Sequence, residues 1–267
     1  MPPAPLPAPT QGRWESAVEP LIAANDGRLW RAHSDAVNAA LVGRWLDEGA
    51  RERLLKTDLF DEAMDAGLYP LLRLHARDVF AIDVAPSVLA AAKLRHPGLE
   101  IVAADVRRLP FADAAFDIVV SNSTLDHFET RAEIRDALDG LHRVLRPGGR
   151  LILTLDNPRH PAVALRNALP YPWLRRLGLV PYPVGVTMGP GALRRALRAT
   201  GFEVLDMVAL LHCPRAAAVR RSRALERRAT PGSRARFLRR LARWESLAAL
   251  PTRFLTGHYV GALARKS

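Results

Sequence analysis

The feature that most constrains the fold of this chain is an alternation of short apolar runs with stretches of helical periodicity. Parallel strands need crossover connections of about a dozen residues or more, which helices usually supply. The alternation therefore predicts a doubly wound α/β fold, in which helices cover both faces of a parallel sheet. The predicted strands are Arg53–Leu59, Val79–Val84, Glu100–Ala104, Phe116–Ser121 and Arg150–Leu155, and the helices between them are Asp61–Leu74, Val88–His96 and Arg131–Leu145.

The segments on either side of this alternation predict further elements. Residues 1–12 are rich in proline and alanine and predict a disordered tail. Residues 13–50 predict an N-terminal helical lid, and residues 51–267 predict the main domain. The remaining predicted elements are helices over Trp14–Asn25, Arg28–Leu46 and Gly191–Thr200, and strands over Phe202–Leu211 and His258–Ala264.

Cysteine content and hydropathy exclude several classes of protein. The 267 residues include one cysteine, Cys213, which excludes a disulfide framework and a zinc site built on several cysteines. No uninterrupted apolar run approaches the roughly eighteen residues of a membrane span. The first residues lack the basic and apolar regions of a secretory signal. We therefore expect a soluble, cytoplasmic protein without a metal site.

The positive charge of the chain is concentrated in one segment. The formal net charge is +12, and 36 of the 39 basic residues are arginine, since lysine occurs only as Lys56, Lys93 and Lys266. Residues 214–253 carry twelve arginines against two acids, Glu226 and Glu245, which gives a local net charge of +10. The rest of the chain is therefore nearly neutral.

This arginine-rich segment predicts two helices divided at Thr230-Pro231-Gly232. Over residues 233–250, apolar residues gather on one helical face and arginines mostly on the other. Such a helix suits peripheral contact with an anionic membrane surface, or packing on the domain with its arginines in solvent. Nucleic-acid binding is disfavoured because no recognition module accompanies the charge.

Acidic residues end two consecutive predicted strands. Asp83 follows the run Val79–Ile82, and Asp105 follows the run Ile101–Ala104. Ligands of open parallel sheets bind outside the carboxyl ends of the strands. An acid at the end of the second strand can accept hydrogen bonds from both ribose hydroxyls. Asp105 and the backbone N–H of Val106 suit the edge of an adenine ring, so the pair of acids predicts an adenosine-containing ligand.

Two longer motifs resemble the small-molecule branch of the class I S-adenosylmethionine-dependent methyltransferases. One runs from Asp105 through Leu109-Pro110-Phe111 to Phe116-Asp117, and the other is Leu145-Arg146-Pro147-Gly148-Gly149. The resemblance covers roughly residues 50–212. It implies a Rossmann-like sheet of seven strands in the order 3-2-1-4-5-7-6, with the last strand antiparallel, and S-adenosylmethionine as the cofactor.

The resemblance also implies cofactor-binding residues. Asp83, with Val84 beside it, would bind the ribose hydroxyls, and Asp105 with Val106 would bind the adenine. Asp58 fits the acid that normally ends the first strand of the family. Two further residues, Ser121 and Asn122, would face the methyl donor from the end of the fourth strand.

The loop after the first strand departs from the family pattern. Phe60, Glu62 and Met64 stand where glycines are expected, and the first glycine is Gly67. Side chains there would crowd a backbone that has to approach the methionine part of the cofactor. Either the loop is reshaped, so that Asp58 or Glu62 meets the cofactor ammonium, or the site is degenerate and the chain is a non-catalytic binding or assembly protein. The intact strand-end acids favour the first interpretation.

Methyl transfer from a sulfonium is an in-line displacement, in which the enzyme mainly aligns donor and acceptor. His127, in the loop after the fourth strand, is the first candidate for a general base, and His33 on the N-terminal lid is the second. Residues 158–190 predict a substrate-side insertion that either walls an apolar acceptor pocket or folds onto the core. We therefore predict methyl transfer to a small acceptor, either apolar or a secondary metabolite.

One further motif is not assigned a role in catalysis. Asp156-Asn157-Pro158 resembles the Asn/Asp-Pro-Pro motif of nucleic-acid amino-methyltransferases. It follows the fifth predicted strand rather than the fourth, and Arg159 replaces the second proline. The sequence predicts neither the atom that accepts the methyl group nor the oligomeric state.

Overall fold

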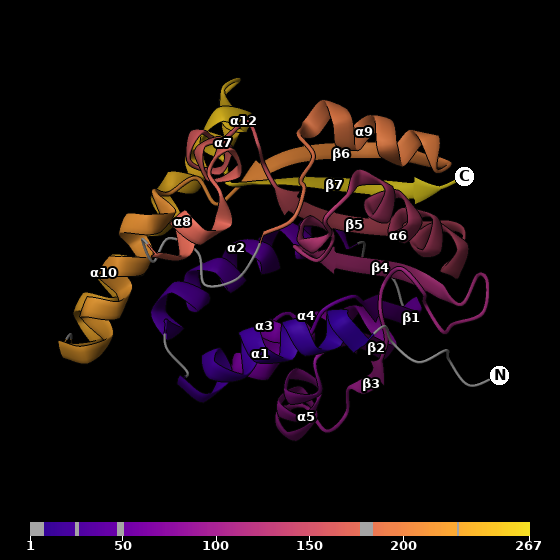
Figure 1. Ribbon diagram of the computed structural model, residues 1–267, viewed down its shortest axis with the longest axis horizontal. Helices are drawn as coiled ribbons and strands as arrows, with labels where there is room; N and C mark the ends of the chain where they lie inside the picture. The colour runs from indigo at the N-terminus through magenta and orange to yellow at the C-terminus, as the bar shows by residue number, and fades with distance from the viewer. Residues whose placement is uncertain (1–7, 25–26, 47–50, 177–183, 229) are drawn as a thin grey trace.

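A seven-stranded sheet forms the centre of the structure, a computed structural model that describes residues 8–24, 27–46, 51–176, 184–228 and 230–267. The strand order is β3-β2-β1-β4-β5-β7-β6 (Figure 1). Strands β1 to β5 are parallel, whereas β7 runs antiparallel to both β5 and β6. This confirms the predicted order and the antiparallel last strand. The strands are β1 (Arg51–Lys56), β2 (Ala76–Asp83), β3 (Glu100–Ala103), β4 (Phe116–Asn122), β5 (Leu145–Asp156), β6 (Phe202–Leu210) and β7 (Tyr259–Lys266).

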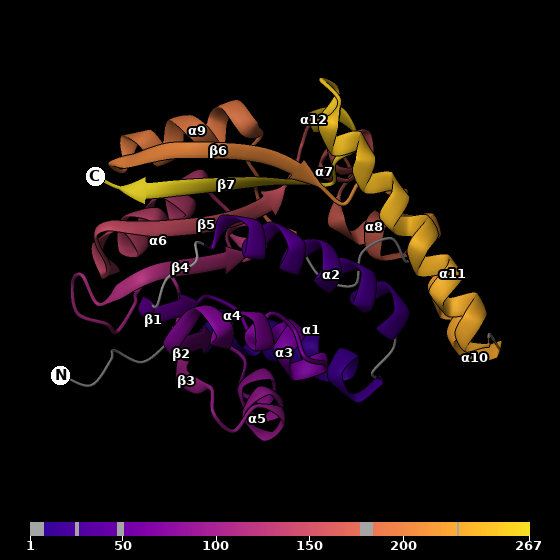
Figure 2. The same cartoon turned by 180° about the vertical axis from the view of Figure 1, so that it is seen from behind.

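Helices cover both faces of this sheet, as the alternation of elements predicted (Figures 1 and 2). Two helices, α6 and α9, pack on one face, and α2, α4 and α5 pack on the other. The short helices α7 and α8 follow β5, and the 3₁₀ helix η1 follows β4. The bounds are α1 (Ala8–Ala24), α2 (Arg28–Trp45), α3 (Phe60–Met64), α4 (Tyr69–His75), α5 (Pro86–Arg95), η1 (Leu125–His127), α6 (Arg131–Val144), α7 (Pro161–Ala168), α8 (Tyr171–Arg176) and α9 (Pro190–Ala199).

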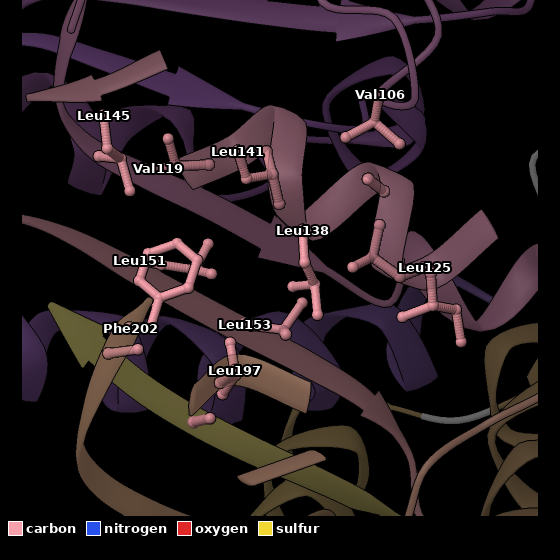
Figure 3. Packing of buried hydrophobic residues seen from close by; sticks show 14 of the residues in the cluster. Val106, Val119, Leu125, Leu138, Leu141, Leu145, Leu151, Leu153, Leu197 and Phe202 are labelled. Atoms are coloured by element: carbon pink, nitrogen blue, oxygen red, sulfur yellow. The ribbon is translucent and has the colours of Figure 1, made fainter. Parts of the chain in front are cut away.

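The core on the α6 face is built from aliphatic side chains at helical and strand spacing. Leu138 and Leu141 of α6 lie close to Val119 of β4 and Leu151 of β5, and none of the four is exposed to solvent (Figure 3). Helix α6 begins with a capping box, in which Thr130 and Glu133 satisfy each other's backbone N–H groups. The sequence pattern thus fixes both the start of α6 and the face that it buries.

The N-terminal helix begins earlier than the sequence predicted. Residues 8–12, expected to belong to a tail, form the first turns of α1, while residues 1–7 lie outside the described residues. Contacts further along α1 hold it on the domain. The carboxylate of Glu15 accepts hydrogen bonds from the backbone N–H (3.1 Å) and the hydroxyl (3.1 Å) of Ser87, at the start of α5. Tertiary contacts of this kind stabilise helices whose own propensity is low.

The segment after β1 also differs from the prediction. The single helix expected over Asp61–Leu74 is two short helices, α3 and α4, because the backbone of Gly67 turns into the left-handed region (φ 55°). Pro70 then lies in the first turn of α4, where its missing N–H is tolerated. Strand β1 ends at Lys56 rather than at Leu59.

The arginine-rich segment forms a helical hairpin divided at Thr230, as predicted. The second helix ends at Ala242 instead of continuing to residue 250. Its apolar side chains face the domain, since Leu241 is buried and Phe237 partly buried in a small cluster with Cys213 and Trp30. The elements are α10 (Arg215–Arg228), α11 (Pro231–Ala242), the 3₁₀ helix η2 (Arg243–Ala249) and α12 (Arg253–Thr256). No helix in the described part of the chain has both the length and the apolar character needed to cross a bilayer.

Candidate functional site

The carboxyl ends of β1, β2 and β4 meet at one edge of the sheet, and helix α1 lies over that edge. At one point of α1, Glu15 bonds to Ser87, just beyond the end of β2. The neighbouring Trp14 makes an edge-to-face contact with His127 of η1, just beyond β4, at 4.6 Å between ring centroids. Because these two contacts lie on either side of the strand ends, α1 covers the edge where the sequence predicted the site.

A buried lysine, Lys56, ends β1, two residues before the predicted cofactor ligand Asp58. The Nζ atom of Lys56 lies 2.8 Å from Glu62 Oε2 and 3.1 Å from Asp58 Oδ1, and it donates to the carbonyl of Asp58 at 2.7 Å. Only 2% of its side chain is exposed. Burial lowers the pKa of Lys56, but the carboxylates of Asp58, Glu62 and Asp61 raise it above its ordinary value. The ammonium therefore stays charged at any physiological pH.

Glu62 holds the loop together and does not face a ligand, contrary to one of the sequence predictions. Its side chain is fully buried between Lys56 and the backbone N–H of Leu68, which donates to Oε1 at 2.9 Å. A Cβ atom on Gly67 would lie 2.6 Å from the carboxylate of Glu62, so only glycine fits there. The first glycine of the loop therefore accommodates a buried acid.

Asp58, which the sequence predicts to meet the cofactor ammonium, lies beside Lys56 just beyond the end of β1. Its Oδ1 contacts Lys56, whereas its Oδ2 is buried and has no hydrogen-bond partner. Burial raises the pKa of Asp58, and the charge of Lys56 opposes that shift. A buried carboxylate oxygen without a partner is rare in folded proteins. It is an acceptor to which an amino group can donate.

Asp83 lies at the end of β2 with its carboxylate fixed by the backbone. Its Oδ2 accepts from the N–H of Leu59 (3.0 Å) and its Oδ1 from the N–H of Ala85 (2.9 Å). Burial raises the pKa of Asp83 to about 6, although these backbone hydrogen bonds lower it. Each oxygen keeps a second lone pair, which suits two ribose hydroxyls. Val84 lies partly exposed beside it.

Asp105, by contrast, is already paired within the protein. Both of its oxygens accept from the guanidinium of Arg107, at 3.1 Å or less, and Oδ1 also accepts from the Arg107 N–H. Arg107 also reaches Glu133 at 2.5 Å and lies over the ring of Phe128. The side chain of Val106 packs in the core (Figure 3). Adenine could bond to Asp105 only after sharing or displacing this guanidinium, which the sequence prediction missed.

Ser121 and Asn122 form hydrogen bonds with residues on either side of β4. Ser121 is fully buried and accepts a hydrogen bond from the hydroxyl of Thr57 at 2.9 Å. The Oδ1 of Asn122 accepts from the hydroxyl of Thr154 at 2.6 Å. Sequence reasoning expected both residues to face the methyl donor. In the structure their hydrogen bonds link β4 to Thr57 and to β5, and their role toward the donor stays a prediction.

The two candidate bases have different positions. His127 lies at the edge, under Trp14, and close enough to Asp58 for its charge to affect the pKa of that carboxyl. His33 lies elsewhere, buried between α2 and the arginine-rich hairpin, with Nε2 at 3.7 Å from the Sγ of Cys213. Its position excludes the predicted role of His33 as a base at this edge. The structure therefore keeps His127 alone as a candidate.

Carboxylates outnumber cations around Lys56, in the half of the edge formed by the ends of β1 and β2. Asp35 of α2 and Asp61 of α3 lie near Asp58 and Glu62 around Lys56. Burial and the charge of Glu62 raise the pKa of Asp35 to about 6, and burial together with Asp35 and Asp58 raises that of Asp61 well above its ordinary value. S-adenosylmethionine carries a sulfonium and an amino group. The residues present, with the unpartnered oxygen of Asp58, fit this group.

Comparison with known proteins identifies the family. Residues 65–153 match the family described as a methyltransferase domain. The chain is 33% identical over 189 residues to the demethylmenaquinone methyltransferase of Beutenbergia cavernae, a match that covers 69% of this chain and 70% of that protein. It is 34% identical over 193 residues to the enzyme of the same name from Thermus thermophilus, covering 66% and 81%. The chain belongs to the S-adenosylmethionine-dependent methyltransferases.

A solved structure shares the fold of this methyltransferase. An S-adenosylmethionine-dependent methyltransferase from Mesorhizobium loti superposes with a TM-score of 0.58 at 18% identity, covering 85% of this chain and 96% of that one. The family assignment supplies S-adenosylmethionine as the methyl donor, and the alternative of a non-catalytic protein is not supported. The family match begins at residue 65, after the loop with the buried lysine. Sequence reasoning did not include Lys56 in the site. Its one unusual feature in the sequence is that it is one of three lysines in a chain whose other basic residues are arginine.

Proposed function

We propose that this methyltransferase transfers its methyl group to a small apolar acceptor of the demethylmenaquinone class. The observation that carries the cofactor half is the unpartnered, buried Oδ2 of Asp58, which would accept a hydrogen bond from the amino group of S-adenosylmethionine. Asp83 would accept from the ribose hydroxyls, beside Val84. Asp105 and the N–H of Val106 would reach the adenine, with Arg107 sharing the carboxylate. His127 would take a proton from the acceptor where one has to leave.

The insertion after β5 supports an acceptor site next to this cofactor site. Its last described part, which starts at Val184, returns to the loop after β4, where Gly185 N–H donates to the carbonyl of Asp126 (2.9 Å) and Val186 N–H to that of Phe128 (2.7 Å). A Cβ atom on Gly185 would lie 2.0 Å from the Phe128 carbonyl oxygen, so this close approach needs glycine. The insertion therefore walls the edge beyond β4, and the names of the relatives suggest a quinone-type acceptor.

Two measurements test this function. Calorimetric titration with S-adenosylhomocysteine should show binding that Asp58→Asn and Asp83→Ala weaken. Asp78→Ala is the matched control, because Asp78 is a half-exposed acid on the same strand, away from the edge. Transfer of a labelled methyl group from S-adenosylmethionine should then occur to demethylmenaquinol. It should not occur to malonyl-[acyl-carrier protein], the acceptor in the name of another relative. No binding at millimolar S-adenosylhomocysteine would refute the cofactor site, and the opposite acceptor preference would refute the acceptor class.

We also propose that the arginine-rich hairpin contacts an anionic membrane surface. Both acids of the segment bond to backbone: Glu226 accepts from the N–H of Gly27 and Leu29, and Glu245 accepts from those of Leu211 and His212. Both carboxylates are therefore held by backbone N–H groups. Within the described residues, the following exposed arginines form no ion pair: Arg220, Arg221, Arg223, Arg227, Arg236, Arg239, Arg240 and Arg243.

The apolar face of α11 is not the membrane-contacting surface that residues 233–250 suggested, because it packs on the domain. Exposed apolar side chains instead follow the helix: Trp244 is 44% exposed, Leu250 45% and Leu255 54%. The hairpin stands at the same end of the molecule as α7 and α8 of the insertion (Figures 1 and 2). An acceptor with a lipid tail would therefore approach this end from the bilayer. Arginines beside exposed tryptophan and leucine are typical of peripheral membrane contacts.

A further inference from the structure

A second group of buried charges lies at the other half of the edge, where β5 ends and β7 begins. Asp156, the last residue of β5, forms an ion pair with Arg166 of α7 at 2.5 Å. Its other oxygen lies 3.5 Å from Nε2 of His258, which precedes β7. Arg215, at the start of α10, lies with Nη1 at 3.0 Å from the same Nε2. Asp156 and His258 are both more than nine-tenths buried.

The hydrogen bonds of this group determine the tautomer of His258. The guanidinium of Arg215 can only donate, so Nε2 of His258 must be the acceptor of their contact. The proton of the neutral ring is then on Nδ1. This Nδ1 atom is buried and has no hydrogen-bond partner. His258 thus presents a buried N–H donor that no protein atom satisfies.

Such an arrangement is costly unless a ligand uses it. A buried donor without a partner costs about 1–3 kcal/mol, and buried ion pairs seldom stabilise a fold relative to apolar residues of similar size. The group has a positive excess, because two arginines surround one carboxylate. Burial and the charge of Arg215 lower the pKa of His258 to about 3, so the ring is neutral at pH 7. No three His, Cys, Asp or Glu side chains in the described ranges are placed to hold a metal ion.

The group adjoins the edge formed by the carboxyl ends of β1, β2 and β4. The backbone N–H of Asp156 donates to Oδ2 of Asp126 at 2.9 Å, and Asp126 is the neighbour of His127 in η1. We infer that His258, with Arg215 and Arg166, binds an acceptor oxygen that carries negative charge during methyl transfer. The Nδ1–H of His258 donates to that oxygen, and the two guanidinium groups supply positive charge. This inference rests on the proposed function, since it names the part of the acceptor that the site holds.

Methylation of a ring carbon next to a hydroxyl would be favoured by such a subsite. Loss of the hydroxyl proton, to His127 or to solvent, leaves an oxyanion, whose electron pair makes the neighbouring ring carbon nucleophilic. That carbon forms a bond to the methyl group while the bond from sulfur to methyl breaks, leaving neutral S-adenosylhomocysteine. The ring carbon then loses its own proton to water or a base, and the aromatic ring is restored. Fixed donors aimed at the oxyanion stabilise the reacting form.

The test uses two coloured probes that differ in charge. At pH 7.5, 2-hydroxy-1,4-naphthoquinone is an enolate anion and 1,4-naphthoquinone is neutral, and absorbance titration gives the Kd of each, with and without S-adenosylhomocysteine. We expect the full-length protein to bind the anion at least tenfold more tightly than the neutral ring. His258→Phe should abolish this preference. His258→Asn, whose amide N–H can take the place of Nδ1–H, should retain most of it, and His258→Gln should not.

His142→Phe is the matched control, because His142 is a half-buried ring packed on Phe202 near the opposite edge. It should leave both Kd values unchanged. Equal binding of the two probes by the unaltered protein, or full preference in His258→Phe, would overturn the inference. If His258→Phe does not fold, the contrast between the Asn and Gln variants decides. Loss of S-adenosylhomocysteine binding alone refutes the proposed function, whereas the probe preference without that ligand still tests this site.

Discussion

The two halves of the sheet edge use opposite charges in mirrored arrangements. At the ends of β1 and β2, a buried cation, Lys56, is surrounded by carboxylates. At the end of β5, a buried carboxylate, Asp156, is surrounded by Arg166, Arg215 and His258. The first half suits a donor with a sulfonium and an amino group, and the second suits an acceptor that becomes negative. Charges in a buried site act strongly on each other. This contrast supports the proposal that donor and acceptor bind at opposite halves of the edge.

The largest expected effect comes from removing the cation of the acidic half of the edge, which we define as Lys56 with the carboxylates around it. Lys56→Met leaves Asp58 and Glu62 buried without their cation, so we expect the free energy of unfolding to fall by about 3–5 kcal/mol. Denaturant unfolding followed by circular dichroism measures it. Lys56→Met with Glu62→Gln should lose less, because Gln keeps the bond from Leu68 without the charge. Lys93→Met, at an exposed lysine, is the control, and an equal loss there would contradict the assignment.

The second prediction tests whether the arginine-rich hairpin, which adjoins Arg215 of the basic half, binds an anionic membrane surface. Replacing Arg236, Arg239 and Arg240 by Gln should weaken binding to vesicles of equal parts phosphatidylglycerol and phosphatidylcholine by about 3 kcal/mol, at roughly 1 kcal/mol per arginine. Sedimentation at low salt measures it, because salt screens such contacts. Gln at the exposed Arg77, Arg131 and Arg135 makes the same change in net charge and should have little effect. No sedimentation of the unaltered protein would rule out the membrane contact.

The third prediction sharpens the assignment of the cofactor to the acidic half. Asp83→Ala should weaken S-adenosylhomocysteine binding by about 1–3 kcal/mol, the range for a hydrogen-bonded group lost from a buried site. Calorimetry gives the Kd. Part of the effect would come from the N–H groups of Leu59 and Ala85, which lose their acceptor. Asp83→Asn keeps an acceptor for one of them and should lose less. Unchanged affinity in both variants would place the ribose elsewhere.

The smallest predicted effect depends on pH. The pKa of Asp35 is raised to about 6 by burial and the charge of Glu62, so its ionised form is disfavoured in the folded state. Between about pH 4 and 6 the folded protein binds the proton more tightly than the unfolded chain, and this contribution to stability is lost as pH rises. Asp35→Asn should therefore stabilise the protein at pH 7.5 by on the order of 1 kcal/mol.

The gain from Asp35→Asn should shrink as pH falls through 6 and be gone near pH 4. Thermal melts over this range, compared with the unaltered protein, give the difference. Asp136→Asn, at an exposed acid of α6, should show no such trend. A gain that stays constant down to pH 4 would mean that the ionisation of buried Asp35 is not what lowers stability.

Local patterns in the sequence predicted the sheet and one side of the site. Short apolar runs and helices with period 3.6 report burial directly, so the alternation of elements and the two covered faces followed from them. The strand order came instead from the resemblance to the class I methyltransferases. Asp83 was found because an acid at the end of a buried strand is conspicuous. The prediction was weaker where a boundary depends on distant contacts, as for the start of α1, which Glu15 and Trp14 tie to the domain.

By itself, the sequence determined the doubly wound fold, the strand-end acids and the isolation of the positive charge in one segment, and its resemblance to a known family implied the antiparallel last strand. Only the tertiary structure decided which charges meet. Lys56 pairs with Glu62 six residues away, and Arg107 pairs with Asp105 two residues away. Asp156 contacts His258, which is about a hundred residues away in the sequence. Periodicity encodes which face is buried, but the pairing of buried charges depends on the three-dimensional approach of side chains, which no local pattern contains.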